Sequence, residues 1–253
     1  PFSFNDDRDP YRKRHAGVKL RHTLADGHSL GLQALASDAV THFDAGPGSD
    51  DLNRQRITSV ALDSRNRMAI NWQSLLRLAR GSDHLDTEGA FPSRFTTEQD
   101  QLTWQHDVQA LGANWVGGIE WRRESVGGDT AYSQTSRRIA SLFGGASTRA
   151  GAHAVEGSLR LDRNSQFGSR GTGRAGYALD LAPGWRGGAN AGTAFRAPSF
   201  NDLYFPLSFG FSGNPQLRPE RSRGGDLALR YAQGGTTASL TLFAQRIRDL
   251  IAV

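Results

Sequence analysis

The stretch GTAFRAPSFNDLYFPLSFGFSGNPQLRPE, residues 192–220, separates two segments in which apolar and polar residues alternate. It contains four prolines: Pro198, Pro206, Pro215 and Pro219. Because proline has no N–H to donate to a sheet ladder, we expect this stretch to be a long connection between two strands. Long irregular connections are uncommon in compact domains and usually carry function.

Alternation with a period of two residues runs through most of the remaining chain. Leu102, Trp104 and His106, for example, alternate with Thr103 and Gln105. Such alternation indicates strands with one apolar and one polar face. The pattern predicts twelve strands, at residues 11–25, 28–44, 54–64, 69–82, 95–109, 114–125, 132–145, 150–163, 171–182, 185–197, 220–233 and 236–252.

The lengths of these predicted strands and of their connections favour a membrane barrel. Strands in soluble proteins average about 5–6 residues, whereas strands that cross a bilayer need about 9–11. Short and long connections alternate along the chain, which places tight turns at one rim and elaborated loops at the other, as in outer-membrane barrels. The sequence therefore predicts an all-β fold, an antiparallel up-and-down transmembrane β-barrel. Its first and last strands would be bare edges, so we expect the chain to be a fragment of a larger barrel.

Eight aromatic residues are expected on the apolar face near strand ends, where interfacial aromatic girdles lie. They are Trp72, Trp104, Trp115, Trp121, Tyr177, Trp185, Phe195 and Tyr231. Ordinary core aromatics are the alternative interpretation.

The composition excludes several classes of protein. The 253 residues include no cysteine, which excludes disulfide scaffolds and thiolate metal sites. No apolar run reaches about 18 residues, so no membrane-spanning helix is expected. The net charge of +5 suggests an anionic partner, but the arginines are scattered and form no nucleic-acid-binding stripe. No catalytic constellation or phosphate-binding loop is present, which argues against an enzyme.

Several motifs together resemble one family. TAFRAP, NDLYFP and GNPQLRPE lie within residues 193–220, RLDRNSQFGSRGT spans 160–172, and QRIRDLIAV spans 245–253. This set resembles the TonB-dependent outer-membrane receptors, and NSQFG resembles their cobalamin (vitamin B12) branch. The resemblance implies about twelve strands of a 22-stranded barrel in the outer membrane of a Gram-negative bacterium. Residues 1–253 would then be part of the barrel domain, with the plug and the C-terminal strands outside this chain.

The resemblance also implies a ligand and partners. Such receptors bind a large, scarce ligand at their outer loops and import it with energy from the TonB complex, surrounded by outer-membrane lipid. The ligand expected here is cobalamin or a related corrinoid, and a ferric siderophore is the alternative. A passive porin and a soluble nucleic-acid binder are two further hypotheses. Residues that match the ligand-contacting segments are Asn164, Ser165, Gln166, Phe167, Arg196, Ser199, Asn201, Leu203 and Tyr204.

A structural calcium site is the second implication of the resemblance. Asp7, Asp9, Asp44 and Asp51 match loop aspartates that bind Ca²⁺ in cobalamin receptors. Ca²⁺ takes 6–8 oxygen ligands, and clustered loop carboxylates can supply them. Solvated loop aspartates without a metal are the alternative.

Overall fold

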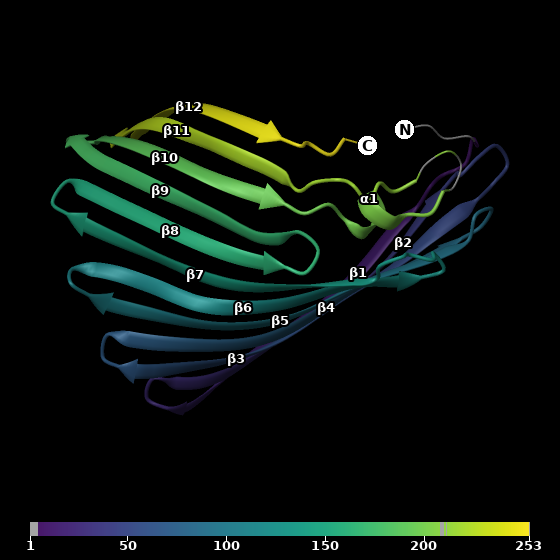
Figure 1. Ribbon diagram of the computed structural model, residues 1–253, viewed down its shortest axis with the longest axis horizontal. Helices are drawn as coiled ribbons and strands as arrows, with labels where there is room; N and C mark the ends of the chain where they lie inside the picture. The colour runs from purple at the N-terminus through teal and green to yellow at the C-terminus, as the bar shows by residue number, and fades with distance from the viewer. Residues whose placement is uncertain (1–4, 208–209, 211, 253) are drawn as a thin grey trace.

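The computed structural model describes residues 5–207, 210 and 212–252, and these form one antiparallel sheet of twelve strands in chain order. The sheet is rolled into an open trough (Figure 1). The all-β, up-and-down fold is therefore confirmed. The elements are β1 (Tyr11–Ala25), β2 (His28–Phe43), β3 (Asp51–Ala69), β4 (Trp72–Glu88), β5 (Ser93–Ala110), β6 (Ala113–Gly128), β7 (Ser136–Ala150), β8 (His153–Asn164), β9 (Gly168–Ala182), β10 (Trp185–Arg196), α1 (Phe200–Tyr204), β11 (Glu220–Gln233) and β12 (Thr236–Arg248).

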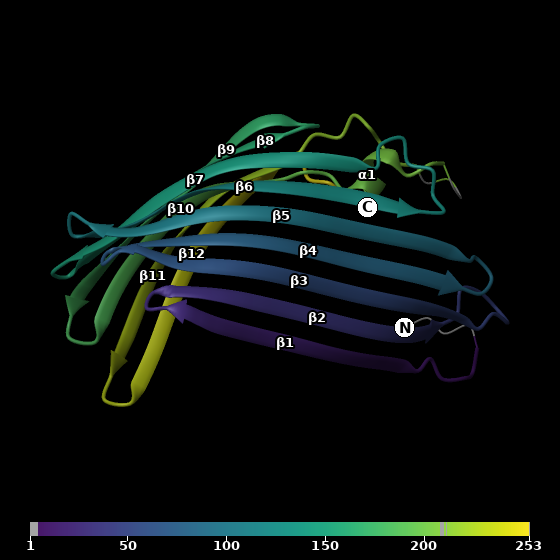
Figure 2. The same cartoon turned by 90° about the horizontal axis from the view of Figure 1, so that it is seen from below.

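The two rims of the trough differ as the connection lengths predict. At one rim, every turn is a residue pair: 26–27, 70–71, 111–112, 151–152, 183–184 and 234–235. At the other rim lie the longer loops, of which 197–219 is the longest. We call these the short-turn rim and the loop rim; Figure 2 shows β1 to β5 running side by side between them.

Some predicted strand bounds were wrong. β3 and β4 extend to Asp51 and Glu88, beyond the predicted ends at 54 and 82, and β7 begins at Ser136, not at 132. Near the loop rim the strands carry polar residues on both faces, as in the pairs Asn53–Thr87 and Arg54–Asp86. The apolar half of the period-two pattern disappears there, although the backbone ladder continues.

The register places apolar and polar side chains on opposite faces. One row of facing residues crosses six strands and is almost wholly leucine: Leu20, Leu32, Leu62, Leu78, Leu102 and Trp121. The neighbouring row of facing residues, displaced by one residue along each strand, is mostly polar: Arg21, Gly31, Asp63, Arg77, Thr103 and Glu120. Leu62 is 53% exposed, whereas Asp63 is 4% exposed. Side chains crowd on the concave face of a curved sheet, so the polar face is the inner one and the leucines point outward.

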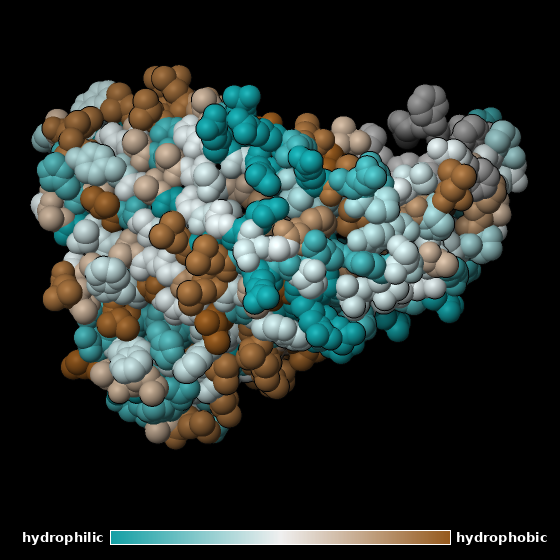
Figure 3. Space-filling view, in the orientation of Figure 1, coloured by the Kyte–Doolittle hydropathy of each residue, from teal (hydrophilic) through white to brown (hydrophobic). Residues whose placement is uncertain are grey.

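The aromatic residues also lie on the outward face. Trp72 and Val108 face each other across β4 and β5, and the Trp185 and Tyr231 rings lie 4.9 Å apart at the short-turn rim. Trp104 and Trp121 are outward too, but they lie well inside their strands. Figure 3 shows hydrophobic residues gathered toward the short-turn rim and hydrophilic ones toward the loop rim. No helix among the described residues is long and apolar enough to cross a bilayer.

Candidate functional site

The longest loop contains a short helix that the alternation pattern did not predict. Helix α1 begins after Ser199, whose hydroxyl accepts a hydrogen bond from the Asp202 N–H, while the Asp202 carboxylate accepts one from the Ser199 N–H. This reciprocal pair is a capping box, which satisfies two backbone donors at a helix start. The Ser-x-x-Asp spacing in the sequence is a signal that could have revealed the helix.

The GNPQLRPE segment closes this loop against α1. The Gly213 N–H donates to the Phe205 carbonyl at 2.8 Å, and the Asn214 N–H donates to the Asp202 carbonyl at 2.7 Å. A Cβ atom at Gly213 would lie 2.6 Å from the backbone of Leu203 and Tyr204, so no larger residue fits without moving the chain. The segment therefore fixes the shape of the loop.

Arg137 anchors the loop to the wall of the trough. Its guanidinium donates to the Pro198 carbonyl at 2.7 Å, pairs with Glu124 at 2.5 Å, and lies over the Phe200 ring at 5.0 Å. The Arg137 side chain is only 11% exposed. Because Arg137 lies on the inner face of β7, these contacts hold α1 over the mouth of the trough.

Three loops meet through polar side chains at this position. The side-chain Nε2 of Gln166 donates to the side-chain Oε1 of Gln134 at 2.6 Å and to the Tyr204 hydroxyl at 3.2 Å. The Tyr204 hydroxyl also donates to the Gln134 oxygen at 3.1 Å, and the Tyr132 hydroxyl donates to the Asn201 side-chain oxygen. We call these five residues the amide–tyrosine cluster. They bring together loops 129–135, 165–167 and 197–219.

Two polar atoms in this region have no partner among the described residues. The Asn164 Nδ2 and the Gln166 Oε1 are buried and make no hydrogen bond. Asn164 is 3% exposed, and its Oδ1 accepts from the Gln166 N–H at 2.9 Å. Buried polar groups are normally paired, so these two atoms remain available to a bound molecule or to water.

The other predicted ligand-contact residues take varied positions. Ser165 is hydrogen-bonded to the backbone of Arg138, and Arg196 pairs with Glu220 at 3.4 Å at the start of β11. Phe167 is half-buried. Leu203 is 1% exposed and packs inside the loop, so it offers no surface to a ligand.

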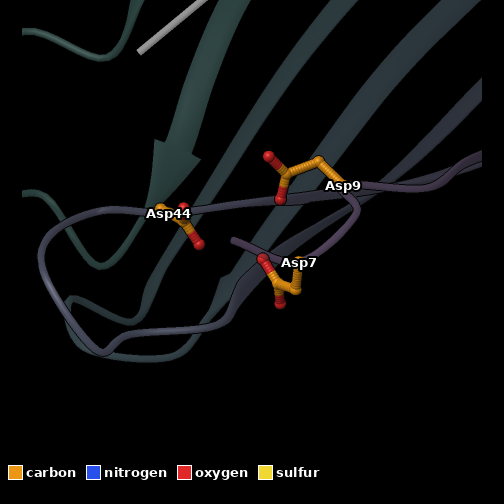
Figure 4. Close-up of side chains that lie close together, drawn as sticks. All are labelled: Asp7, Asp9 and Asp44. Carbon is orange, nitrogen blue, oxygen red and sulfur yellow. The ribbon is translucent and has the colours of Figure 1, made fainter. Parts of the chain in front are cut away.

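Three of the four predicted calcium ligands come together. Asp7, Asp9 and Asp44 each offer a carboxylate oxygen, and these atoms lie within 4.8 Å of one another (Figure 4). Desolvation, together with the carboxylates of Asp44, Asp7 and Asp50, raises the pKa of Asp9. Both oxygens of Asp44 accept hydrogen bonds from Asn5, each at 2.9 Å, which fixes the orientation of this carboxylate.

Asp51 lies outside this acidic group. It is 1% exposed, and its carboxylate accepts the N–H of Ala45 at 3.1 Å and that of Ala90 at 2.5 Å. These bonds join loop 44–50 to loop 89–92, so the geometry gives Asp51 a structural role in holding the two loops.

Sequence reasoning missed three residues of the site: Tyr132, Gln134 and Arg137. The first two were assigned to a strand that in fact begins at Ser136. The run of small and polar residues at 133–136 has no apolar alternation, and that is the one signal of a loop.

Comparison with known proteins gives a consistent result. Residues 1–253 match the family model described as TonB dependent receptor-like, beta-barrel. Over 98% of its length, the chain is 28% identical to the vitamin B12 transporter BtuB of Photobacterium profundum. The match covers 41% of that protein, so the chain spans about two fifths of the length of this curated relative.

Solved structures share the fold at low sequence identity. A mutant of the ferric enterobactin receptor PfeA of Pseudomonas aeruginosa aligns with a TM-score of 0.81 at 16% identity, covering 95% of this chain and 43% of that one. A double mutant of the hemophore receptor HasR of Serratia marcescens, solved with its hemophore HasA and heme, aligns with a TM-score of 0.80 at 16% identity, covering 96% and 47%.

Proposed function

Since the chain belongs to the TonB-dependent receptor family of Gram-negative outer membranes, we propose that it is the ligand-capturing wall of a receptor that imports cobalamin or a related corrinoid. The energy would come from the TonB complex. The 28% identity to a vitamin B12 transporter over 98% of the chain carries this proposal. The family is one of transport receptors, not of enzymes.

The amide–tyrosine cluster supports a large polar ligand. Gln134, Gln166 and Asn201 present amides, and Tyr132 and Tyr204 present hydroxyls on aromatic rings. Such groups suit a flat macrocycle edged with amides, since they offer hydrogen bonds and stacking surfaces together. The buried Asn164 Nδ2, which has no partner among the described residues, is a further donor next to Gln166, whose backbone N–H donates to the Asn164 Oδ1.

Calorimetric titration of the full-length receptor with cyanocobalamin tests this proposal. We expect tight binding, weakened about two- to twelvefold in Gln166→Ala, because one hydrogen bond of about 0.5–1.5 kcal/mol is lost. Gln233→Ala, at the exposed end of β11 near the short-turn rim, is the matched control and should bind as the parent does. Absence of cyanocobalamin binding would refute the proposal.

A ferric siderophore is the second candidate ligand, favoured by the PfeA likeness in fold. The same titration with ferric enterobactin separates the two. Binding of ferric enterobactin without binding of cyanocobalamin would replace the first candidate by the second.

We also propose that Asp7, Asp9 and Asp44 hold a calcium ion that orders the outer loops. The donor set fits, because the three residues each offer one carboxylate oxygen within 4.8 Å of the others, and Ca²⁺ prefers oxygen ligands. Calcium titration of the full-length receptor should show binding that Asp9→Asn weakens. Asp26→Asn, whose side chain is 88% exposed in turn 26–27 at the short-turn rim, is the control. Equal binding in Asp9→Asn and the parent would refute the site.

A further inference from the structure

Two buried hydrogen-bond donors without an acceptor lie on the hairpin of β8 and β9. They are Nδ2 of Asn164 and Nε of Arg170, and neither has a hydrogen-bond partner among the described residues. Asn164 faces Gly168 at the end of β8, and Arg170 lies two residues farther along β9, opposite Asp162. Such diagonal neighbours are about 7–8 Å apart, which a long side chain can span. Leu161 is 61% exposed on the outer face, so its neighbour Asp162 shares the inner face with Asn164 and Arg170.

The hydrogen bonds that these two side chains do make determine which of their atoms remain unpaired. The Asn164 Oδ1 accepts the backbone N–H of Gln166 at 2.9 Å, so the unpaired end of this amide is its donor nitrogen. The Arg170 Nη1 donates to the Ser169 carbonyl at 2.8 Å, while the Nε has no acceptor. Buried polar groups in folded proteins are normally paired with protein, water or a ligand. The two donors therefore require an oxygen acceptor that the described residues do not supply.

The positive charge of Arg170 is not neutralised by any carboxylate in the described part of the chain. Asp162 faces Arg170 across the two strands, but it forms its ion pair with Arg160, at 2.9 Å. Glu220, at the start of β11, pairs with Arg196 at 3.4 Å. Hydrogen bonds from a guanidinium to an ionised oxygen are about twice as strong as those between neutral groups. The acceptor that best fits Arg170 and Asn164 is therefore an anionic oxygen.

An unpaired acceptor belongs to the same hairpin. The Gln166 Oε1 is buried and has no partner among the described residues, although the Nε2 of this side chain bonds to Gln134 and Tyr204. The three unpaired atoms together match a ligand group in which an anionic oxygen lies close to an N–H donor. The nucleotide loop of cobalamin contains such a group, because a short aminopropanol linker joins a secondary amide to a phosphodiester. Arginine is well suited to binding phosphate oxygens.

Entry to these atoms requires a side chain of the amide–tyrosine cluster to move. All three unpaired atoms are closed off from solvent. The hydrogen bond from Gln166 to Tyr204, at 3.2 Å, is the longest of the four in the cluster, and longer hydrogen bonds are weaker. We therefore expect this bond to open when the ligand group enters.

We propose that the Arg170 Nε and the Asn164 Nδ2 bind a phosphodiester oxygen of the imported corrinoid, while the Gln166 Oε1 accepts the N–H of the adjoining amide. This inference rests on the proposed function and makes Arg170 a residue that determines specificity for corrinoids with a nucleotide loop. Two observations carry it: three unpaired buried polar atoms on one hairpin, and an arginine on that hairpin without an ion pair among the described residues.

Calorimetric titration of the full-length receptor with cyanocobalamin and with dicyanocobinamide, which lacks the nucleotide loop and its phosphodiester, tests the proposal. Arg170→Gln should bind cyanocobalamin about ten- to 100-fold more weakly, because a hydrogen bond to a charged group is lost, and should bind dicyanocobinamide as the parent does. Asn164→Asp, which keeps the acceptor for Gln166 but replaces the donor by a negative oxygen, should show the same selective loss. Arg163→Gln, an exposed arginine on the outer face of the same hairpin, is the matched control and should leave both affinities unchanged. Unaltered heat-modifiable migration on gels would confirm that each variant folds.

The two ligands separate failure of this inference from failure of the proposed function. If Arg170→Gln weakens the binding of both ligands equally, or of neither, the phosphodiester contact is overturned while the proposed function stands. If the parent binds neither ligand, the proposed function is refuted, and the contact with it. Titration with inorganic phosphate identifies a free anion as the alternative source of phosphate. Tight phosphate binding by the parent that is lost in Arg170→Gln, without a selective loss of cyanocobalamin, would assign the donors to a free anion and would also overturn the inference.

Discussion

Replacing Asp51 by alanine should release two loops at once. The Asp51 carboxylate is 1% exposed and accepts the N–H groups of Ala45 and Ala90, so the change leaves two donors without a partner. A hydrogen bond to a charged group contributes about 1.5–3 kcal/mol, and because Ala45 and Ala90 are exposed to water, the loss of both bonds should cost about 2–4 kcal/mol in total. Because about 1.4 kcal/mol is a factor of ten, exchange of these amides should accelerate about 30- to 700-fold.

Hydrogen–deuterium exchange of the full-length receptor, followed by mass spectrometry of peptides covering 44–50 and 89–92, measures this effect. Asp50→Ala is the neighbouring control, because that side chain is 67% exposed and forms a hydrogen bond only with His42 among the described residues. The experiment should be run with calcium and with chelator. If Asp51 holds the loops directly, the acceleration appears in both conditions. Acceleration that appears with calcium but not with chelator would refute this reasoning and make Asp51 a metal ligand.

Three further predictions concern the loops. Gly213→Ala should destabilise the packed state of loop 197–219 by about 1–3 kcal/mol, because the added Cβ would lie 2.6 Å from the α1 backbone. Limited proteolysis should detect faster cleavage of this loop. Gly127→Ala, where the added Cβ meets open space, is the control and should not be cleaved faster. Arg137→Gln should weaken cyanocobalamin binding, because the hydrogen bond from the guanidinium to the Pro198 carbonyl, which anchors loop 197–219, is lost. Arg138→Gln is the control, and its cyanocobalamin affinity should equal that of the parent. Because the pKa of Asp9 is raised, a proton competes with calcium at a higher pH than it would at an ordinary aspartate. Calcium affinity should therefore be full above that pKa and fall as pH drops through it. A pH series of calcium titrations checks this, and a flat profile would contradict it.

The wall of the barrel was predictable from sequence because a strand in a membrane must alternate. Leu78 and Leu102 could be assigned to the lipid side from their positions alone, and the register confirms that they face each other. The signal weakened where the strands rise above the membrane, since the pairs Asn53–Thr87 and Arg54–Asp86 put polar residues on both faces of β3 and β4. Strand ends in that region therefore could not be placed.

The candidate site was predictable only in part. Gln166 and Tyr204 were identified by resemblance, and the structure joins them directly. Gln134, which bonds to both, lies about 30 and 70 residues away in sequence and belongs to no motif. Contacts between loops arise from the register of the strands that carry them, and single-sequence patterns do not contain that register.

The most direct test of the whole account is the environment of adjacent side chains in one strand. The chain has no cysteine, so single spin labels can be placed at Leu78→Cys and Ala79→Cys of β4 in the full-length receptor in lipid bilayers, with any cysteines outside this chain removed. Accessibility to oxygen and to a water-soluble nickel chelate is then compared by electron paramagnetic resonance. We expect the label at position 78 to be highly accessible to oxygen and poorly accessible to the nickel chelate. The label at position 79 should be less accessible to oxygen than the label at position 78. The reverse order, with position 79 in lipid and 78 facing the interior, would contradict it.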